Sequence, residues 1–165
     1  MKMKEPKLET WNLTDLHSHP SQDTLFLKPT AKEIERLAQD IAANGLQVPL
    51  DVLPDGTLLR GHSRCLALEL LGEAQVTVNV RYDLAEASEQ EQLNFLIDDN
   101  LHRRQLSPVE IARCAIAKIG QLQALDGSGK RRIKGKLKEQ VAAELGMSKR
   151  NLNVTVHAPV SDGAG

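Results

Sequence analysis

The spacing of apolar residues predicts a helix near the beginning of the chain. Apolar side chains recur at positions 34, 37, 38 and 41, which is the spacing of one helical face. Thr30 followed by Glu33 forms a capping-box pattern, so we expect the helix to begin directly after Thr30. Asn44-Gly45 ends it, because glycine readily adopts the left-handed conformation that follows many helices.

The next part of the chain carries the strand signals. Residues 48–53 (VPLDVL) and 57–61 (TLLRG) are short apolar runs, and residues 54–56 (PDG) between them supply turn chemistry. Residues 63–71 (SRCLALELL) predict a short helix. Residues 76–82 (VTVNVRY) alternate strictly between apolar and polar side chains, as expected of a half-buried strand.

The second half of the chain is predicted to be helical. We expect a helix from about residue 85 to residue 99. Residues 107–110 (SPVE) form a second capping box with proline at the first helical position, and their helix runs to about residue 125. Residues 126–136 (DGSGKRRIKGK) are expected to form a loop, and residues 137–153 two short helices around a turn.

These elements predict an α+β fold, with a small mixed domain followed by an all-α segment. We expect a flexible N-terminus over residues 1–15 and a compact domain over residues 16–105. A helical segment follows over residues 106–153, and an irregular tail over residues 154–165.

Composition narrows the class of protein. The chain has 165 residues, enough for one domain with a helical appendage, and 41 % are hydrophobic. Aromatic residues make up only 2 %, which argues against an RNA-binding surface built on base stacking. No apolar run approaches the roughly 18 residues of a membrane-spanning helix. Cys65 and Cys114 lie in apolar helical patterns and are interpreted as reduced core thiols of a cytoplasmic protein.

Charge is distributed unevenly along the chain. The net charge is −1, but residues 128–153 contain eight Lys or Arg against two Glu. That segment therefore carries +6 and the remainder −7. A basic end on an acidic body indicates a polyanionic partner such as DNA, and a solvated lysine-rich linker is the alternative.

Two short segments have the residue types that bind phosphate. Gly61-His62-Ser63-Arg64 follows a predicted strand and opens a predicted helix, whose N-terminus attracts anions. Arg64 adds a potential bidentate phosphate donor. The second segment, residues 98–104 (DDNLHRR), combines carboxylates, an amide and arginines that together can hold Mg²⁺ and phosphate. An ordinary strand-to-helix turn and a charged interhelix loop are the plain alternatives.

The basic segment also has helix-turn-helix spacing. Ala142, Gly146 and Leu152 occupy the small, glycine and apolar positions of that motif. Many helical hairpins share this spacing, but the +6 charge favours DNA. The candidate DNA contacts are residues of types that bind bases and phosphates: Lys138, Ser148, Lys149, Arg150, Asn151 and Asn153.

Taken in order, these segments resemble the ParB/sulfiredoxin superfamily, and most closely its ParB-type partition and DNA-binding proteins. The resemblance covers roughly residues 13–153. DGTLLRGHSRCLALELLG resembles the family's strand, G-x-x-R phosphate motif and helix. DNLHRRQLSPVEIA resembles the pattern E-N-L-x-R followed by L-[SN]-P-x-E-x-A, which is the most specific of the matches.

The resemblance implies a nucleotide site in the N-terminal domain and DNA binding through the helix-turn-helix. By motif, phosphate would contact Gly61, His62, Ser63 and Arg64 together with Asn100 and Arg103. Mg²⁺ would be held near Asp99 and Asn100, and the base would lie near residues 48–50. The expected cofactor is CTP or another nucleotide with Mg²⁺. The expected partners are DNA and further copies of the chain on DNA, in a nucleoid- or plasmid-associated cytoplasmic protein.

Departures from the family pattern limit the expected chemistry. Partition proteins usually carry G-E-R-R-x-R-A where this chain has G-H-S-R-C-L-A, so His62 replaces a Glu tied to hydrolysis. We therefore expect little or no CTP hydrolysis and assign no catalytic residue. Sulfiredoxin chemistry is not expected, because Cys65 follows the arginine of the motif. A nucleotide-dependent enzyme of the same fold, a kinase or a nuclease, is the alternative, and an interaction module without ligands is a third interpretation.

Overall fold

The computed structural model describes residues 5–103, 106–125 and 135–152. The chain divides into two compact units. The first comprises residues up to Asp23 and Leu27–Leu96, and the second comprises Thr24–Phe26 and the residues from Ile97 onward. The unit boundary therefore lies earlier than the expected boundary at residue 105, and it falls inside a helix.

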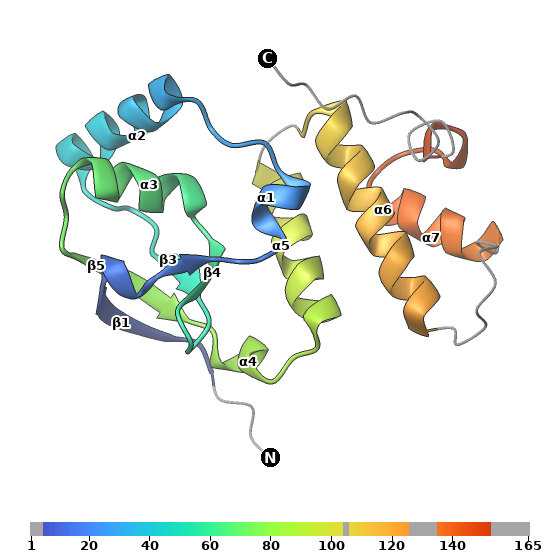
Figure 1. Ribbon diagram of the computed structural model, residues 1–165, viewed down its shortest axis with the longest axis horizontal. Coiled ribbons are helices and arrows are strands. Elements are labelled where there is room, and N and C mark those ends of the chain that lie inside the picture. The colour runs from blue at the N-terminus through green and yellow to red at the C-terminus, as the bar shows by residue number, and fades with distance from the viewer. Residues whose placement is uncertain (1–4, 104–105, 126–134, 153–165) are drawn as a thin grey trace. The chain divides into compact units, whose positions relative to one another are not determined.

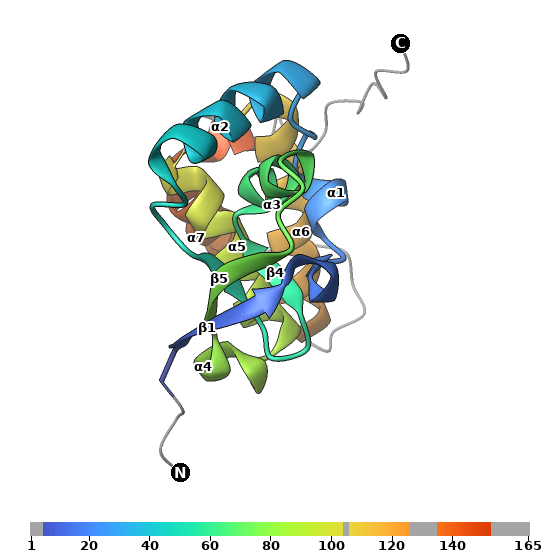
Figure 2. The ribbon, with the colours of Figure 1, turned by 90° about the vertical axis from the view of Figure 1, so that its left-hand side faces the viewer.

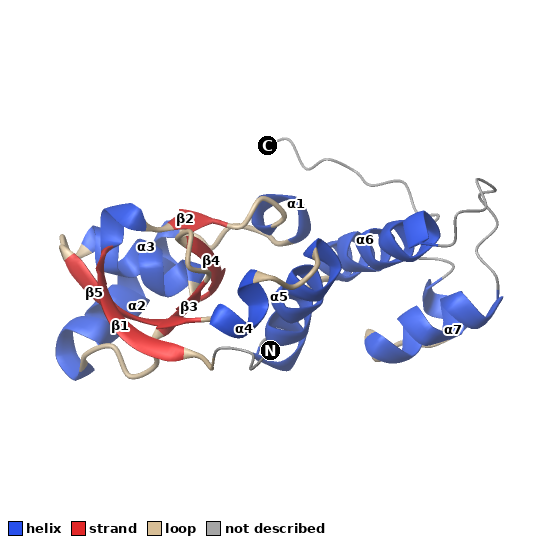
Figure 3. Cartoon of the chain, turned by 90° about the horizontal axis from the view of Figure 1, so that it is seen from below, coloured by secondary structure: helices blue, strands red, loops and turns tan. Residues whose placement is uncertain are grey.

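The first unit contains a five-stranded mixed sheet in the order β1-β5-β3-β4-β2 (Figure 1). The strands are β1 (Lys7–Asn12), β2 (His17–Ser18), β3 (Leu50–Val52), β4 (Thr57–Arg60) and β5 (Gln75–Val80). β5 pairs antiparallel with β1 and parallel with β3, β3 pairs antiparallel with β4, and β2 pairs parallel with β4. All five strands lie in this unit (Figure 3). The mixed α+β fold expected from the sequence is confirmed.

Two helices cover one face of the sheet. α2 (Ala31–Asn44) and α3 (His62–Leu70) lie side by side in both views (Figures 1 and 2). Thr30 and Glu33 form the predicted capping box at the start of α2. The core between helices and sheet is aliphatic and includes Leu50, Val52, Leu58, Val78 and Val80 from the strands and Ile41 and Leu68 from the helices. Cys65 and Cys114 are buried and form no disulfide bond, as predicted.

A polar network holds the sheet together near the C-terminal end of β4. The carboxylate of Asp51, which is only 4 % exposed, lies 3.2 Å from the Arg60 guanidinium and accepts a 2.6 Å hydrogen bond from Asn79. The guanidinium groups of Arg60 and Arg81 lie 5.7 and 4.6 Å from the ring centre of Phe95. These cation–π contacts fix the first half of α5 (Glu89–Arg103) to the strands.

The expectation of a flexible N-terminus over residues 1–15 is wrong for its described part. Residues Lys7–Asn12 form β1 and pair along their whole length with β5, and Leu13–Asp15 form a 3-10 turn. The strand was missed because most of its side chains are polar and exposed, which is typical of a strand at a sheet edge. The residues between this turn and α2 contain β2 and the short helix α1 (Gln22–Leu25).

The second unit is helical in its described residues. α6 (Pro108–Leu125) begins at the predicted capping box, where Ser107 N–H donates to Glu110 and Glu110 N–H donates to Ser107 Oγ. α7 (Gly135–Glu144) packs against α6. Within the described part of the chain, no helix combines the length and apolar character that a bilayer crossing requires.

The start of α5 also differs from the expected helix over residues 85–99. Tyr82–Ala85 form a separate short helix, α4, and Ser88 with Glu91 forms a further capping box that starts α5 at Glu89. The spacing of Ser88 and Glu91 is visible in the sequence and predicts this start. Of the basic loop expected over residues 126–136, residues 126–134 lie outside the described residues, and Gly135 and Lys136 belong to α7 instead. The irregular tail expected over residues 154–165 also lies outside the described residues.

Candidate functional site

The segment Gly61–Arg64 stands where β4 ends and α3 begins. Gly61 is the N-cap residue with φ of +101°, and no side chain caps the helix. A Cβ atom on Gly61 would come within 2.5 Å of the Leu50 side chain, so the turn accepts only glycine without rearrangement. The first helical hydrogen bond runs from Cys65 N–H to Gly61 O at 2.8 Å. The N–H groups of His62 and Ser63 precede that bond and give this end of α3 its partial positive charge.

His62 has an unusual environment at this turn. Its Nε2 atom is buried and has no hydrogen-bond partner among the described residues. Burial, reinforced by the nearby His19, lowers the pKa of His62 to about 4, while Asp23 acts in the opposite direction. The imidazole is therefore neutral at pH 7. A buried polar atom without a partner costs free energy, so a ligand that supplies the missing hydrogen bond would be bound favourably.

Arg64 has a structural role that the sequence did not suggest. One of its guanidinium nitrogens, Nη1, donates to the carbonyl oxygens of Val48 and, at 3.0 Å, Pro49. This contact anchors the loop before β3 to the start of α3. The expected bidentate phosphate contact from Arg64 must therefore be made with its other nitrogens, or after the Val48 and Pro49 contacts are released.

The residues expected to lie near the nucleotide base differ in their exposure to solvent. Val48 is 43 % exposed, whereas Leu50 is fully buried against the sheet core. Leu50 is consequently a core residue, and Val48 and Pro49 remain at the surface beside the turn.

The second predicted phosphate segment is on the last turns of α5. Asp99 and Asn100 are partly exposed, and Arg103 is the last residue of the helix. Asp98 lies 3.7 Å from the ammonium of Lys118, and its carbonyl oxygen is 2.6 Å from His102 Nδ1. These contacts give Asp98 a structural role. Because residues 61–64 and 99–103 belong to different units, the composite nucleotide site remains a prediction.

The described residues can be tested for a metal site. No group of three or more His, Cys, Asp or Glu side chains is close enough to hold a metal ion in the described part of the chain. The helix N-terminus and His62 Nε2 fit an anion such as phosphate. The Mg²⁺ expected at Asp99 and Asn100 would need further oxygen ligands, which a bound nucleotide would have to supply.

Four of the candidate DNA-binding residues, Ser148, Lys149, Arg150 and Asn151, directly follow the turn after α7, whereas Lys138 lies within α7. Gly146 has φ of +65°, and Met147 N–H donates to Ala142 O at 2.9 Å, which closes the helix end. Residues 149–152 are helical, and Ser148 Oγ accepts a 3.2 Å hydrogen bond from Asn151 N–H. Ala142 and Leu152, two of the three residues that set the spacing, are buried.

The exposed side chains at this turn differ in their contacts. Lys149 lies 2.6 Å from the carboxylate of Glu139. Ser148, Arg150 and Asn151 are exposed, and Lys138 is partly exposed. Asn153 and the four basic residues at positions 130, 131, 132 and 134 lie outside the described residues. The turn therefore exposes polar and basic groups, and the DNA contact itself stays a prediction.

Comparisons with known proteins identify the fold. No protein-family model and no curated protein matches the sequence. Among solved structures, the pNOB8-like ParB N-domain matches with a TM-score of 0.67 and 13 % identity over 92 % of this chain and 68 % of that one. The C-terminally truncated chromosome-partitioning protein ParB from Caulobacter crescentus matches in two complexes.

The Caulobacter complex with CTP-γ-S has a TM-score of 0.51 and 20 % identity over 90 % of this chain and 76 % of that one. The complex with the centromeric parS site has a TM-score of 0.55 and 22 % identity over 89 % and 69 %. The mixed sheet, the glycine turn before α3 and the helices that follow therefore give this chain the fold of a ParB-like N-terminal domain.

Proposed function

We propose that this protein is a ParB-like DNA-binding protein whose first unit binds a nucleotide at the turn formed by Gly61–Arg64. The proposal of a nucleotide site depends on one observation. The buried Nε2 atom of His62, at the N-terminus of α3, has no hydrogen-bond partner among the described residues. A phosphate oxygen placed there would accept hydrogen bonds from the backbone N–H groups of the helix N-terminus. It would also give the imidazole nitrogen its missing hydrogen-bond partner. The CTP-γ-S complex of a ParB with the same fold supports a nucleotide as the ligand.

The proposed role of His62 is to bind phosphate without promoting hydrolysis. At neutral pH the imidazole is uncharged, so it donates or accepts a single hydrogen bond and does not replace a carboxylate. A nearby phosphate would favour the protonated imidazole, so binding should take up a proton. Nucleotide affinity should consequently rise as the pH falls from 8 to 6.

Isothermal titration with CTP, ATP and inorganic triphosphate tests this site. His62→Phe keeps a ring of similar size but removes both nitrogens, and it should lower affinity at least about fivefold, the loss of one good hydrogen bond. His17→Asn is the matched control, because the ring of His17 contacts Thr57 on β4 rather than the turn. If the wild type binds none of the three ligands at millimolar concentration, the nucleotide site is refuted.

We further propose that DNA binds at the turn after α7. Arg150 and Asn151 are exposed at the start of a helical turn, where the helix N-terminus also favours phosphate. The parS complex of a ParB with the same fold supports this partner. The proposed setting is partition of a chromosome or plasmid, or regulation on a mobile element, in the cytoplasm, with self-association on DNA.

Fluorescence anisotropy with duplex DNA from 50 to 200 mM salt tests DNA binding. The logarithm of the binding constant should fall linearly with the logarithm of salt, with a slope of about −0.9 per neutralised phosphate. Arg150→Ala should reduce that slope by about one unit. Arg36→Ala, an exposed arginine of α2, is the matched control. If Arg150→Ala and Arg36→Ala change the slope equally, DNA does not bind at this turn.

A further inference from the structure

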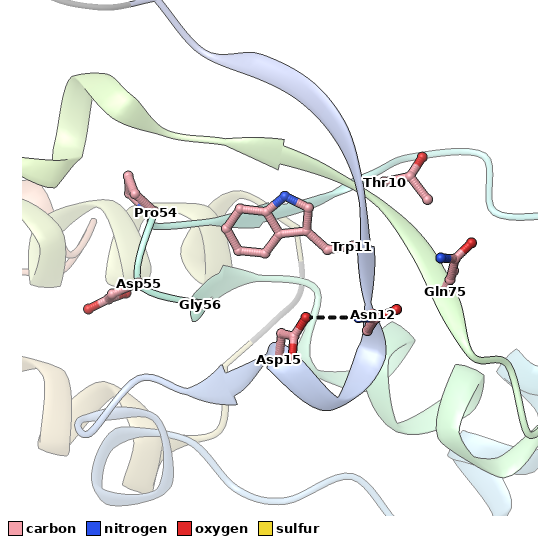
Figure 4. A pocket seen from close by; sticks show the side chains of 8 residues that line it. All are labelled: Thr10, Trp11, Asn12, Asp15, Pro54, Asp55, Gly56 and Gln75. Carbon is pink, nitrogen blue, oxygen red and sulfur yellow. Dashed lines mark hydrogen bonds between the residues drawn. The ribbon is translucent and has the colours of Figure 1, made fainter.

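A hollow with a volume of about 400 Å³ lies beside Trp11 (Figure 4), and none of the residues that line it belongs to either proposed binding segment. Trp11 and its neighbours at the end of β1 form one wall, and Pro54, Asp55 and Gly56 of the β3–β4 turn form another. Trp11 is the only tryptophan of the chain and is half-buried. A half-exposed indole in a chain with so few aromatic residues calls for a reason.

A hydrogen bond orients the indole ring at the wall of the hollow. Its N–H donates a 2.9 Å hydrogen bond to Glu9, two residues earlier on β1, so the polar edge of the ring is already satisfied. Glu9 also accepts a 3.1 Å hydrogen bond from the Tyr82 hydroxyl. These two hydrogen bonds, with a smaller effect of Lys7, outweigh burial and hold the pKa of Glu9 below its usual value. The indole therefore stands beside a charged carboxylate and presents an electron-rich face.

Two carboxylates, those of Asp15 and Asp55, line the hollow itself. Asp15 accepts a 3.2 Å hydrogen bond from Asn12, as Figure 4 shows. Asp55 accepts a 2.9 Å hydrogen bond from Thr57 N–H. Burial works against ionisation of Asp55, but the hydrogen bonds from Thr57 and the nearby His17 outweigh it and lower its pKa. Among the residues that line the hollow, none is Lys, Arg or His.

The base of the hollow is rigid. A Cβ atom on Gly56 would lie 2.2 Å from Asp15 O, so the two backbone segments touch directly. His17 N–H donates to Gly56 O at 3.0 Å and joins the same segments a second time. The two aspartates are thus held in place before any ligand arrives, which reduces the entropy lost on binding.

The strand that carries Trp11 has an open edge. β1 is the last strand of the sheet and, among the described residues, pairs only with β5. An edge strand presents backbone N–H and C=O groups to which an extended segment of another chain can add. A peptide on β1 would run past the hollow, because Thr10, Trp11 and Asn12 belong to both.

We propose that this hollow binds the guanidinium group of an arginine carried by an extended segment of a partner protein, which pairs along β1. A guanidinium is planar and stacks on an indole face, and its remaining N–H groups suit the carboxylates of Asp15 and Asp55. The surrounding charge is complementary, since Glu9, Asp15 and Asp55 are acidic. This site is independent of the nucleotide and DNA sites.

Trp11 provides the measurement, because its emission reports directly on the hollow. The full chain is titrated with a capped heptapeptide of alternating Thr and Val with one central arginine, and with the same peptide carrying neutral citrulline. The arginine peptide should change the emission saturably and bind at least about threefold more tightly, as expected for one cation–π contact with exposed ion pairs. N-acetyl-arginine amide should bind more weakly than the peptide, because it cannot pair along β1.

Variants distinguish the pocket from a general charge effect. Asp15→Asn and Asp55→Asn keep an acceptor oxygen and should each weaken the arginine peptide about twofold to fivefold. Glu35→Gln, an equal charge change on the exposed face of α2, should have no effect. Equal affinity for the arginine and citrulline peptides, or aspartate variants that match Glu35→Gln, would overturn the proposal. A saturable response to neutral oligosaccharides but not to the arginine peptide would also overturn it.

Discussion

The ammonium group of Lys118 lies 2.8 Å from a carboxylate oxygen of Glu144. Lys118 belongs to α6 and is only 4 % exposed, whereas Glu144 ends α7 and is 38 % exposed. Burial of Glu144 works against its ionisation, but the hydrogen bond and charge of Lys118 outweigh it and lower the pKa of Glu144. The buried Lys118 therefore joins α7, the helix before the turn that we propose binds DNA, to α6.

Removing either partner should have unequal effects on stability. Glu144→Ala leaves a buried ammonium with Asp98 as its one remaining carboxylate among the described residues, and it should lower the free energy of unfolding by about 2 kcal/mol. Lys118→Met removes the buried charge and keeps the packing, so its cost should stay within about 1 kcal/mol. Urea unfolding measures both values. A Lys118→Met cost as large as that of Glu144→Ala would contradict this account.

The buried imidazole of His62 should make the fold sensitive to acid. The folded-state pKa of about 4 lies below the ordinary value of 6.5, so the neutral form is favoured by folding. The contribution of the neutral imidazole to the free energy of unfolding is fully present above pH 6.5. It is lost as the pH falls from 6.5 through 4, and the loss is at most about 3 kcal/mol. His62→Phe should remove this loss and match or exceed wild-type stability at pH 7. Thermal melts at pH 7 and pH 5 compare the two proteins.

The ion pair between Lys149 and Glu139 should restrain DNA binding. Both side chains are largely exposed, so the pair itself contributes little stability, about 0–1 kcal/mol. Glu139→Gln releases the lysine and removes a charge that repels phosphate. DNA affinity at 100 mM salt should rise about twofold to fivefold, with unchanged melting temperature. Glu73→Gln, in the loop before β5, is the matched control, and a decrease in affinity for Glu139→Gln would show that Lys149 does not contact DNA.

Replacing Gly61 should cost more than replacing another glycine of similar backbone conformation. Alanine at position 61 is strained by the positive φ and also meets Leu50 at 2.5 Å, so we expect a loss of about 2–3 kcal/mol. Gly72 also has positive φ, but no atom lies within 4 Å of its would-be Cβ, so alanine there should cost about 1 kcal/mol. Denaturant titration ranks the variants, and equal losses would mean that the contact with Leu50 relaxes freely.

Signals that act within a few residues could be interpreted from the sequence. The capping boxes at Thr30 and Ser107 and the alternation of β5 follow from local hydrogen bonding and from the period of a half-buried strand. β1 could not be recognised, because its partner β5 lies more than sixty residues away and its exposed side chains carry no apolar pattern.

The candidate site was only partly predictable for a similar reason. The glycine turn at Gly61 is a local feature and was placed correctly between strand and helix. Tertiary contacts decide the rest of the site. Arg64 donates hydrogen bonds to the carbonyl oxygens of Val48 and Pro49, which precede it by about fifteen residues. His62 is buried near His19, which is still further away in the sequence. A motif gives the residue types at a site. It does not show which hydrogen-bond donors of these residues are already used by contacts within the protein.

The polar network at the end of β4 has a consequence for evolution. Arg60 is shared between the carboxylate of Asp51 and the ring of Phe95, and it directly precedes Gly61. Loss of Arg60 would remove the ion pair of Asp51, a buried acid, and leave it with the Asn79 hydrogen bond and the more distant charge of Arg81. We therefore expect correlated substitutions in homologous sequences, so that a change at Arg60 is accompanied by a change at Asp51. Position 62, two residues on, should instead vary with the ligand that each homologue binds.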